Sequence, residues 1–338
     1  MRVCVLTTSY PRTPGESAGA FVAEQVEALR RDGAEVTVVS PSDFRHYGIA
    51  FGAGIAQNLR ARPWLALALP LFFAGYIRAA RRAGRRAEVV HAHWLPSALP
   101  ALATGKPFVL QLWGSDAALA RRTGPLARLL LRRAGRVVGA SAFLADEARA
   151  LGARSVAVVP VGVELPEHVG AAASPPHVLF VGRLSEEKGI LEFLAASEGL
   201  PRVIVGDGPL RSRVPEALGF VAHERLGAYY ARAAVVCVPS RREGYGMAAR
   251  EAMAHGRPVV ATAVGGLRDA VADGVTGILV EPGAPAELAA AIRALLDDPE
   301  RAARLGAAAR AAAERDYSWP VASASLLALY GELLRRTT

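Results

Sequence analysis

The chain has 338 residues, of which 52% are hydrophobic and 21% charged, so it can form two domains with buried cores, and its composition excludes a disordered protein. Cys4 and Cys237 both lie in apolar runs, which predicts buried thiols and excludes a disulfide framework. The formal net charge of +9 is uneven, since residues 1–162 hold 21 basic and 10 acidic residues and residues 163–338 hold 19 and 21. The first half therefore favours an anionic partner.

Short apolar runs alternate with longer amphipathic runs in the first half of the chain. Runs rich in valine or leucine predict buried parallel strands at residues 2–9, 35–41, 88–94, 107–114, 136–141 and 156–162. The N-terminus has one basic residue before an apolar run of strand length, which is not typical of a secretory signal. With two cysteines that need no oxidising compartment, this favours a cytoplasmic protein.

An apolar stretch, residues 63–77, lies in a region that lacks acidic side chains. Between Asp43 and Glu88 there is no acidic residue, but there are eight arginines: Arg45, Arg60, Arg62, Arg78, Arg81, Arg82, Arg85 and Arg86. Fifteen uncharged residues are too few for a membrane span, which needs about 20, and Pro70 argues against a regular one. The stretch is either a helix in an anionic membrane interface or a core helix with a solvated basic flank.

The second half repeats the alternation after a break. Residues 163–177 contain three prolines and many small residues, which predicts a linker. Further strands are predicted within residues 177–183, 201–208, 234–240, 257–266 and 277–283, followed by alanine-rich helical residues 285–315 and a last helix after Tyr317–Trp319.

Strand–helix alternation of this kind predicts an α/β protein with two doubly wound, Rossmann-like domains of parallel sheet facing a cleft. We expect a first domain at residues 1–165 and a second at residues 166–318. The helix within residues 319–338 is expected to pack back on the first domain.

Charged residues follow two of the predicted strands of the second half. Arg183 and Lys188 emerge after the strand HVLFV, and two cations five residues apart can bind one diphosphate and stabilise it as a leaving group. Glu243 lies in a later loop beside two glycines, and Glu251 lies two turns into the helix that we expect next. Taken alone, each of these charges is better explained as a solvated side chain. Together they suggest a site for a phosphorylated sugar.

The motifs GRLSEEKG, VGDGP, EGYGMAAREAMAHGRPVVAT and VGGLRDAVADGVTGILVEPG follow one another between His177 and Trp319. In this order they resemble the C-terminal domain of family 4 of the retaining glycosyltransferases, which have the two-domain GT-B fold. The resemblance implies that Arg183 and Lys188 hold the diphosphate of a nucleotide diphosphate-sugar, while Glu243 contacts the sugar and Glu251 the ribose. It also implies that three backbone amides line the pocket, those of Tyr245, Gly246 and Met247.

The first half resembles the family less closely. PGESAGAFVAEQVEAL is similar to its loop-then-helix opening, with Gly19 at the start of the helix, where a phosphate is favoured. HAHWLPS and QLWGSD match two strand ends, but Trp113 stands where many members have a histidine. His93 is then the best remaining polar candidate for the acceptor side, with Asp116 behind it. Trp113 is expected to stack on a sugar ring or to pack the cleft.

These features together predict a metal-independent, retaining hexosyltransferase. Its donor is a UDP- or GDP-sugar, and its acceptor is a hydroxyl of a glycan or lipid-linked molecule. The protein is cytoplasmic and lies on the inner face of the membrane if residues 60–86 bind an anionic surface. We expect no nucleic-acid partner and no metal, since no clustered Asp-x-Asp or Cys/His set occurs. Two alternatives stay open: an epimerase or hydrolase on the same fold, and a non-catalytic nucleotide-sugar-binding protein.

Overall fold

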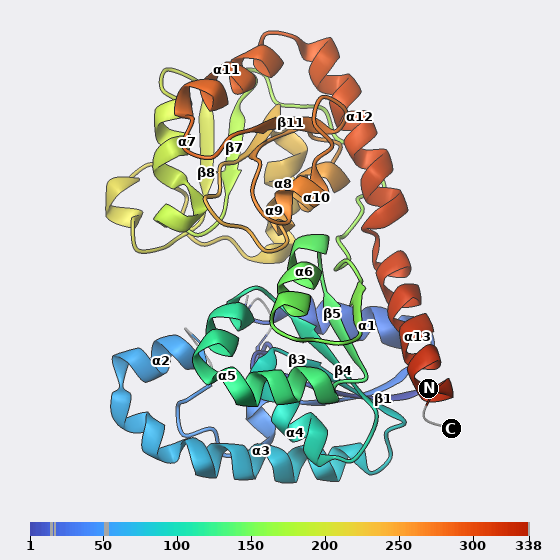
Figure 1. The fold of residues 1–338 in the computed structure, drawn as a ribbon. Helices are drawn as coiled ribbons and strands as arrows, with labels where there is room; N and C mark the ends of the chain where they lie inside the picture. The colour runs from blue at the N-terminus through green and yellow to red at the C-terminus, as the bar shows by residue number, and fades with distance from the viewer. Residues whose placement is uncertain (14–15, 17, 51–53, 337–338) are drawn as a thin grey trace. The chain divides into compact units, whose positions relative to one another are not determined.

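A computed structural model describes residues 1–13, 16, 18–50 and 54–336 of the chain (Figure 1). The chain divides into two compact units, each with its own parallel sheet. Unit 1 comprises Met1–Val161 and Trp319–Thr338, and unit 2 comprises Gly162–Ser318. The division falls at Val161, before residue 165, because the segment from Gly162 onward is bonded to unit 2: the amide of Val163 donates to the carbonyl of Tyr317 at 2.7 Å.

Unit 1 contains six parallel strands in the order β2-β1-β3-β4-β5-β6. Their bounds are β1 (Arg2–Leu6), β2 (Glu35–Val39), β3 (Val89–His93), β4 (Phe108–Leu112), β5 (Arg136–Gly139) and β6 (Val156–Val158). All six strands predicted from the sequence are confirmed. Each is shorter than its apolar run because residues at one or both ends of the run already belong to a loop.

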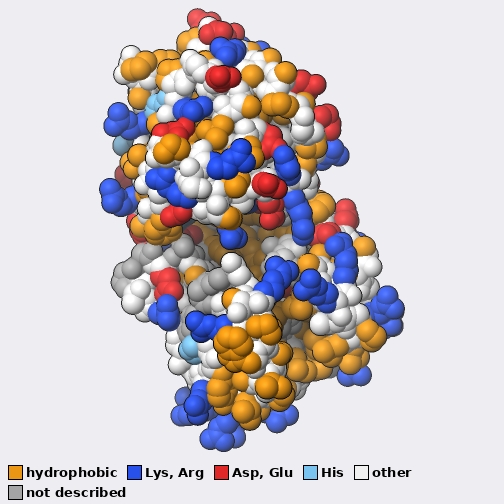
Figure 2. Space-filling view, turned by 90° about the vertical axis from the view of Figure 1, so that its left-hand side faces the viewer, with side chains coloured by type: hydrophobic (Ala, Val, Ile, Leu, Met, Phe, Trp, Pro, Cys, Tyr) orange, Lys and Arg blue, Asp and Glu red, His pale blue; other side chains and the backbone are white. Residues whose placement is uncertain are grey.

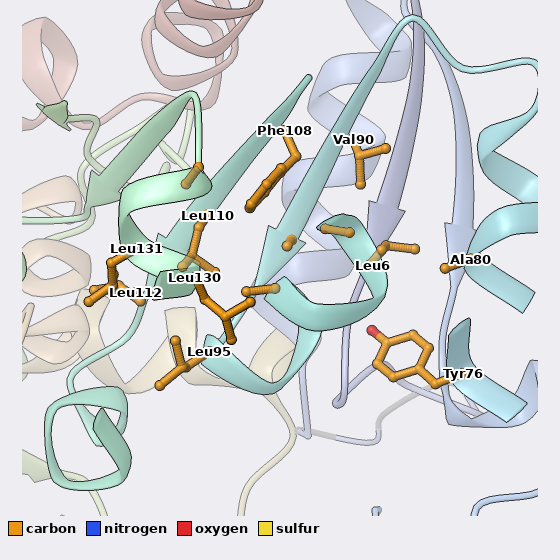
Figure 3. Close-up of a cluster of buried hydrophobic side chains, with 14 of the residues drawn as sticks. Leu6, Tyr76, Ala80, Val90, Leu95, Phe108, Leu110, Leu112, Leu130 and Leu131 are labelled. Carbon is orange, nitrogen blue, oxygen red and sulfur yellow. The ribbon is translucent and has the colours of Figure 1, made fainter. Parts of the chain in front are cut away.

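Helices cover both faces of this sheet. Neighbouring residues of β1 point to opposite layers, so Val3 and Val5 join one core and Cys4 and Leu6 the other. The Val3 side is covered by α1 (Ala20–Arg31) and α13 (Trp319–Arg335). The Cys4 side is covered by α3 (Leu69–Gly84), α4 (Ala98–Ala103), α5 (Ser115–Arg133) and α6 (Ala142–Ala150). Figure 3 shows part of this second core, with Tyr76 and Ala80 of α3 near Leu6 of β1.

The apolar stretch 63–77 forms part of two successive helices. A 3₁₀ helix covers Pro63–Ala68 and runs into α3, with a further short helix, α2 (Ile55–Ala61), before it. Pro70 lies in the first turn of α3, where a missing N–H costs little. Phe72, Tyr76 and Ala80 are fully buried, and the Tyr76 hydroxyl donates to Ser97 at 3.0 Å. One side of α3 therefore packs in the core of unit 1, as one of the two interpretations expected.

Unit 2 contains five parallel strands in the order β11-β10-β9-β7-β8. Their bounds are β7 (Val178–Val181), β8 (Arg202–Val205), β9 (Val235–Val238), β10 (Val259–Thr262) and β11 (Gly277–Val280), and all five were predicted. One face is covered by α7 (Ile190–Ala196) and α11 (Pro285–Leu296), and the other by α8 (His223–Arg232), α9 (Met247–Ala254) and α10 (Leu267–Ala270). Helix α12 (Pro299–Asp316) contributes to both cores.

Two segments of unit 2 differ in detail from the expectation. The helical residues 285–315 form two helices, because Pro299 cannot continue α11 and the Asp298 carboxylate caps α12 by accepting the Arg301 amide at 2.9 Å. Residues 163–177 contain no helix or strand, but they are not a free linker. The amide of Ala173 donates to the Arg232 carbonyl, so this segment is packed along unit 2.

Candidate active site

Both sheets reverse their strand order beside their first strand. In unit 2, β8 lies on one side of β7 and β9 on the other, and in unit 1 β1 likewise lies between β2 and β3. Ligands of doubly wound sheets bind beyond the carboxyl ends of the strands at such a reversal. Arg183 and Lys188 follow β7, and Glu243 follows β9, so they lie at the reversal in unit 2. His93 ends β3 at the reversal in unit 1.

Lys188 and Glu243 form an ion pair in unit 2. The Lys188 Nζ atom lies 2.6 Å from Glu243 Oε2, which also accepts the Ser240 hydroxyl at 3.3 Å. Gly189 makes this meeting possible: it has φ of 70°, and a Cβ atom there would collide with the carbonyl oxygen of Pro239. The loop after β7 is thus pressed against the end of β9. Lys188 and Glu243 are both partly buried, which strengthens their attraction.

Arg183 is the exposed cation of this site. The next residue, Leu184, is held at both backbone groups, since its amide donates to Asp207 and its carbonyl accepts from Leu210, both at 2.9 Å. The Arg183 side chain is exposed and has no ion pair or hydrogen bond within the described part of the chain. The backbone around Arg183 is therefore fixed while its guanidinium is available to a ligand.

Glu251 lies on α9 and is held by a buried tyrosine. Tyr230 of α8 donates its hydroxyl to Glu251 Oε2 at 2.6 Å, and His223 Nδ1 lies 3.6 Å from Glu251 Oε1. Burial, and then the neighbouring Glu251 charge, raises the pKa of Tyr230 well above its ordinary value, so the hydroxyl keeps its proton and remains a donor. The expected position two turns into the helix was wrong. Helix α9 begins only at Met247, which places Glu251 little more than one turn in.

The amino end of α9 carries the three residues whose amides were expected in the pocket. Gly246 precedes the helix with φ of 88°, a conformation that favours glycine, and no side chain caps the helix. Tyr245 is buried beside it, and Met247 is the first helical residue. The first amides of a helix have no partner within it, so this end can bind phosphate oxygens.

Arg250 is a residue of this site that the sequence analysis did not single out. It is 1% exposed, and its guanidinium donates to the Tyr245 carbonyl. It also lies 3.8 Å from the ring centre of Tyr245 and 4.5 Å from that of Tyr317. The sequence carries one signal for a buried arginine here, because Arg250 is a charged side chain among the small residues of MAAREAMA. Arg250 fixes the loop between Glu243 and α9 from inside the protein.

The unit 1 candidates form a buried aromatic cluster at the ends of β3 and β4. His93 is 1% exposed, and its ring is nearly parallel to those of His91 and Trp113, with centroids 4.4 and 5.8 Å away. Burial lowers the pKa of His93 well below its ordinary value, so the imidazole is neutral. Trp113 also contacts Phe21 at 4.4 Å, so its ring packs on unit 1 itself.

Three ring nitrogens of this cluster are buried without a hydrogen bond among the described residues: His91 Nε2, His93 Nδ1 and Trp113 Nε1. The backbone beside them is strained, since Trp94 has φ of 63° and ψ of 149°. Such a conformation costs about 1–3 kcal/mol in a residue with a Cβ atom and is most often found at functional sites. The strain and the unpaired nitrogens mark the end of β3 as the polar position of unit 1 where a ligand would gain hydrogen bonds.

Asp116 does not offer a free carboxylate to an acceptor. One oxygen accepts the amide of Leu95 and the other that of Trp113, both at 2.7 Å. The side chain is fully buried, and this desolvation raises its pKa to about 6 despite the two hydrogen bonds. Asp116 therefore joins the loops after β3 and β4. Asp116 thus supports Trp113, and its place on the acceptor side stays a prediction.

Gly19 begins α1 in the left-handed conformation, with φ of 77°. A Cβ atom there would collide with the carbonyl oxygen of Ser9, so glycine lets α1 start against the loop that follows β1. The earlier part of this motif, residues 14, 15 and 17, lies outside the described residues. Gly19 thus lies on the same edge of the sheet as His93, one strand away.

Comparison with known proteins places this geometry in a family. The family described as "Glycosyltransferase Family 4" matches residues 18–167, and that described as "Glycosyl transferases group 1" matches residues 175–298. The chain belongs to the family 4, group 1 glycosyltransferases. It is therefore an enzyme that transfers sugars from a nucleotide-sugar donor, as the motifs predicted. The family is retaining and metal-independent, and neither an epimerase or hydrolase nor a non-catalytic protein is supported.

Relatives of this glycosyltransferase cover most of its length. It is 33% identical to the D-inositol 3-phosphate glycosyltransferase of Xylanimonas cellulosilytica, over 95% of this chain and 93% of the relative. It is 32% identical to the glycogen synthase of Mycobacterium tuberculosis (strain ATCC 25618 / H37Rv), over 72% of this chain and 69% of the relative.

Solved structures share its fold. Sucrose-phosphate synthase from Thermosynechococcus elongatus matches with a TM-score of 0.82 and 23% identity, covering 99% of both chains. HepE of Anabaena in complex with UDP-glucose matches with a TM-score of 0.74 and 21% identity, covering 98% of this chain and 100% of that one. The predicted GT-B fold of the glycosyltransferase is confirmed.

Proposed function

We propose that unit 2 binds the nucleotide diphosphate-sugar through Arg183, Lys188, Glu243 and Glu251. The observation that carries the proposal is the ion pair of Lys188 and Glu243 at the point where the strand order of unit 2 reverses. Arg183, exposed and unpaired among the described residues, follows the same strand as Lys188. The diphosphate lies against Arg183, Lys188 and the amides at the start of α9. The ribose hydroxyls donate to Glu251, which Tyr230 holds in place.

The two cations assist departure of the nucleotide diphosphate. Before the donor binds, Glu243 neutralises Lys188. The diphosphate then takes Lys188 as its partner and frees Glu243 to accept hydrogen bonds from hydroxyls of the transferred sugar. As the bond from the anomeric carbon to the diphosphate breaks, Arg183 and Lys188 stabilise the charge on the leaving oxygen. The acceptor hydroxyl attacks from the same face, and its proton passes to a phosphate oxygen of the donor.

Unit 1 supplies the acceptor side of the reaction in this proposal. His93 is neutral, and its Nδ1 atom and the Trp113 indole N–H have no partner among the described residues, so both can bind sugar hydroxyls. The donor is a UDP- or GDP-sugar and the acceptor is a glycan or a lipid-linked molecule. The inositol phosphate and glycogen named in the relatives, and the UDP-glucose of HepE, are consistent with hydroxyl acceptors and a uridine donor.

We also propose that the enzyme is cytoplasmic and binds the inner face of the membrane through residues 60–86. Trp64, Leu67 and Leu71 are 64%, 85% and 58% exposed. Figure 2 shows hydrophobic side chains gathered in the lower part of the view, with Lys and Arg side chains around them. Among the described residues, only Pro63–Gly84 is helical, long and apolar enough to cross a membrane, and 17% of its apolar window is buried. Because Phe72 and Tyr76 belong to the core of unit 1, we propose a helix that lies on the membrane.

The donor and acceptor assignments are tested by nucleotide release. UDP- and GDP-sugars are each supplied with three acceptors: a polysaccharide primer, a sugar phosphate, or a lipid-linked sugar in vesicles. We expect one donor and one acceptor class to give turnover, and Glu243→Gln to abolish it. The matched variant Glu224→Gln, on α8, should keep wild-type turnover. Unchanged turnover in Glu243→Gln would remove Glu243 from the reaction.

The membrane assignment is tested by co-sedimentation with anionic vesicles. Leu67→Ser with Leu71→Ser removes two exposed apolar side chains and should weaken binding at least tenfold, since each buried methylene contributes about 0.8 kcal/mol. Leu126→Ser with Leu129→Ser is the control, because these leucines of α5 are also exposed, at 48% and 46%, but lie outside residues 60–86. Equal binding by both double variants would contradict insertion of this patch.

A further inference from the structure

A groove lined by arginines runs along the edge of the unit 1 sheet. It lies between β2 and the second half of α3 and has a volume of about 890 Å³, within the range of small-molecule sites. Two carboxylates line it, those of Glu35 and Asp43. Six guanidiniums line it as well, those of Arg2, Arg45, Arg78, Arg82, Arg85 and Arg86. The groove is therefore strongly positive.

Most of these arginines have no ion pair or hydrogen bond to another described residue. Arg2 pairs with Glu88 at 3.6 Å, and Asp43 is occupied by the amide and hydroxyl of Ser40. The four arginines contributed by α3 and its carboxyl end make no ion pair or hydrogen bond in the described part of the chain: Arg78, Arg82, Arg85 and Arg86.

These four charges also repel one another. Arg78 and Arg82 are four residues apart on α3, and like charges at this spacing destabilise a helix, while Arg85 and Arg86 follow the end of the helix at Gly84. An anion in the groove would remove that repulsion. Guanidiniums bind phosphate with two parallel hydrogen bonds, so phosphate is the anion that this set of donors fits best.

The groove is separate from the proposed active site. It follows β2, the edge strand of the sheet, while His93 ends β3, and β1 lies between these two strands. The donor residues Arg183 and Lys188 belong to unit 2. Neither a donor diphosphate nor an acceptor hydroxyl is needed to explain the groove.

The side of α3 that lines the groove continues into the exposed apolar patch. Leu71, Arg78 and Arg82 have the spacing i, i+7 and i+11, which places them on one stripe of the helix. The stripe is thus apolar at one end and basic at the other, and Leu67 and Trp64 extend the apolar end. A soluble phosphate or a nucleic acid would use only the basic end. A membrane lipid offers a phosphate and a hydrocarbon chain together.

We propose that this groove binds the phosphate head groups of anionic membrane phospholipids and thereby holds α3 on the bilayer surface. The inference rests on the proposed function, in which residues 60–86 face the membrane, and it assigns the phosphate-binding part of that contact to one groove. Apolar insertion by Leu67 and Leu71 and head-group binding by Arg78 and Arg82 are then two separable contributions. Membranes with anionic lipid are bound, and purely zwitterionic membranes are bound weakly.

The test compares two double variants of equal charge. Arg78→Gln with Arg82→Gln removes two groove arginines, and Arg132→Gln with Arg133→Gln removes two exposed arginines of α5 that do not line the groove. Binding is measured by co-sedimentation with phosphatidylcholine vesicles that contain either 30% phosphatidylglycerol or none. A basic residue near an anionic surface contributes enough that losing two should weaken binding on the order of thirty-fold at low salt. The α5 variant should bind like the wild type.

Two results would overturn the proposal. An equal loss of vesicle binding in both double variants would mean diffuse electrostatic attraction. Binding of the wild type to a DNA duplex but to neither vesicle would mean a nucleic-acid partner. Thermal unfolding and UDP titration of the groove variant verify that the fold and the donor site are unchanged. If the donor assignment is wrong, Arg183→Ala binds the nucleotide as tightly as the wild type. If the groove assignment is wrong, only vesicle binding departs from the expectation, so the two failures are distinguishable. If Leu67→Ser with Leu71→Ser retains binding while the groove variant loses it, the groove proposal stands and apolar insertion does not.

Discussion

The ammonium nitrogen of Lys188 lies 2.6 Å from a carboxylate oxygen of Glu243, although 55 residues separate the two in the chain. In the proposed function, the glutamate and a donor diphosphate compete for the same cation. We expect Lys188→Ala to weaken binding of a nucleoside diphosphate by about 10- to 100-fold, since a hydrogen bond to a charged group contributes about 1.5–3 kcal/mol. Glu243→Gln should bind the same nucleotide at least as tightly as the wild type, because Lys188 is then free. Equal weakening in both variants, measured by calorimetry, would contradict the competition.

Tyr230 is expected to act through Glu251 as a positioning residue. Tyr230→Phe removes the hydroxyl that donates to Glu251 and should lower nucleotide affinity several-fold, by about 1 kcal/mol. The reason is that the carboxylate loses its fixed orientation toward the ribose. The 2′,3′-dideoxy form of the nucleotide should bind wild type and variant alike. A similar loss for both nucleotides would instead mean that Tyr230 matters only for the structure of unit 2.

Arg250 is expected to support the loop that carries Glu243. Arg250→Met removes a buried guanidinium that is bonded to the Tyr245 carbonyl and stacked on two rings, which should lower the free energy of unfolding by about 2–4 kcal/mol. Arg250→Lys should not restore it, because an ammonium cannot reproduce the planar contacts. Urea denaturation checks both variants. A lysine variant as stable as the wild type would contradict this role.

Asp116 predicts a pH dependence of stability in unit 1. Burial raises its pKa to about 6 in the folded protein, whereas the ordinary value is 3.8. Between these two values the folded state binds a proton that the unfolded state does not, so stability rises as pH falls from about 6 to about 4. One carboxyl contributes about 3 kcal/mol over this window at about 1.4 kcal/mol per unit. Urea denaturation at several pH values should show this slope in the wild type and not in Asp116→Asn.

Much of the fold could be predicted because the strands are buried on both faces. Runs such as VCVL and VVCV have no polar residue to accommodate, and all eleven strands occur where the runs predict them. Element ends were less accurate because local capping decides them. The start of α9 is delayed to Met247 by Gly244 and Gly246, which moved Glu251 nearer to the helix start than expected.

The positions of Arg183 and Lys188 after a strand could be predicted, and both follow β7, while their role at the diphosphate stays a prediction. The site was not predictable where tertiary packing decides. In the sequence, nothing distinguishes Tyr230 within the run YYAR. Only the fold shows that its hydroxyl oxygen, on α8, lies 2.6 Å from Glu251 Oε2. Asp116 was expected behind His93, but no sequence pattern shows that its oxygens accept two backbone amides, those of Leu95 and Trp113.

The most direct test of the central claim is calorimetric titration of the wild type, Arg183→Ala and Arg304→Ala with UDP, GDP, ADP and dTDP. The claim is that Arg183, exposed and unpaired among the described residues, helps to hold the donor diphosphate in unit 2. Arg304 is an exposed arginine of α12 and serves as the control. The account predicts that one nucleotide binds the wild type and Arg304→Ala equally and Arg183→Ala at least tenfold more weakly. Equal affinity in all three proteins, or no binding of any nucleotide, would contradict it.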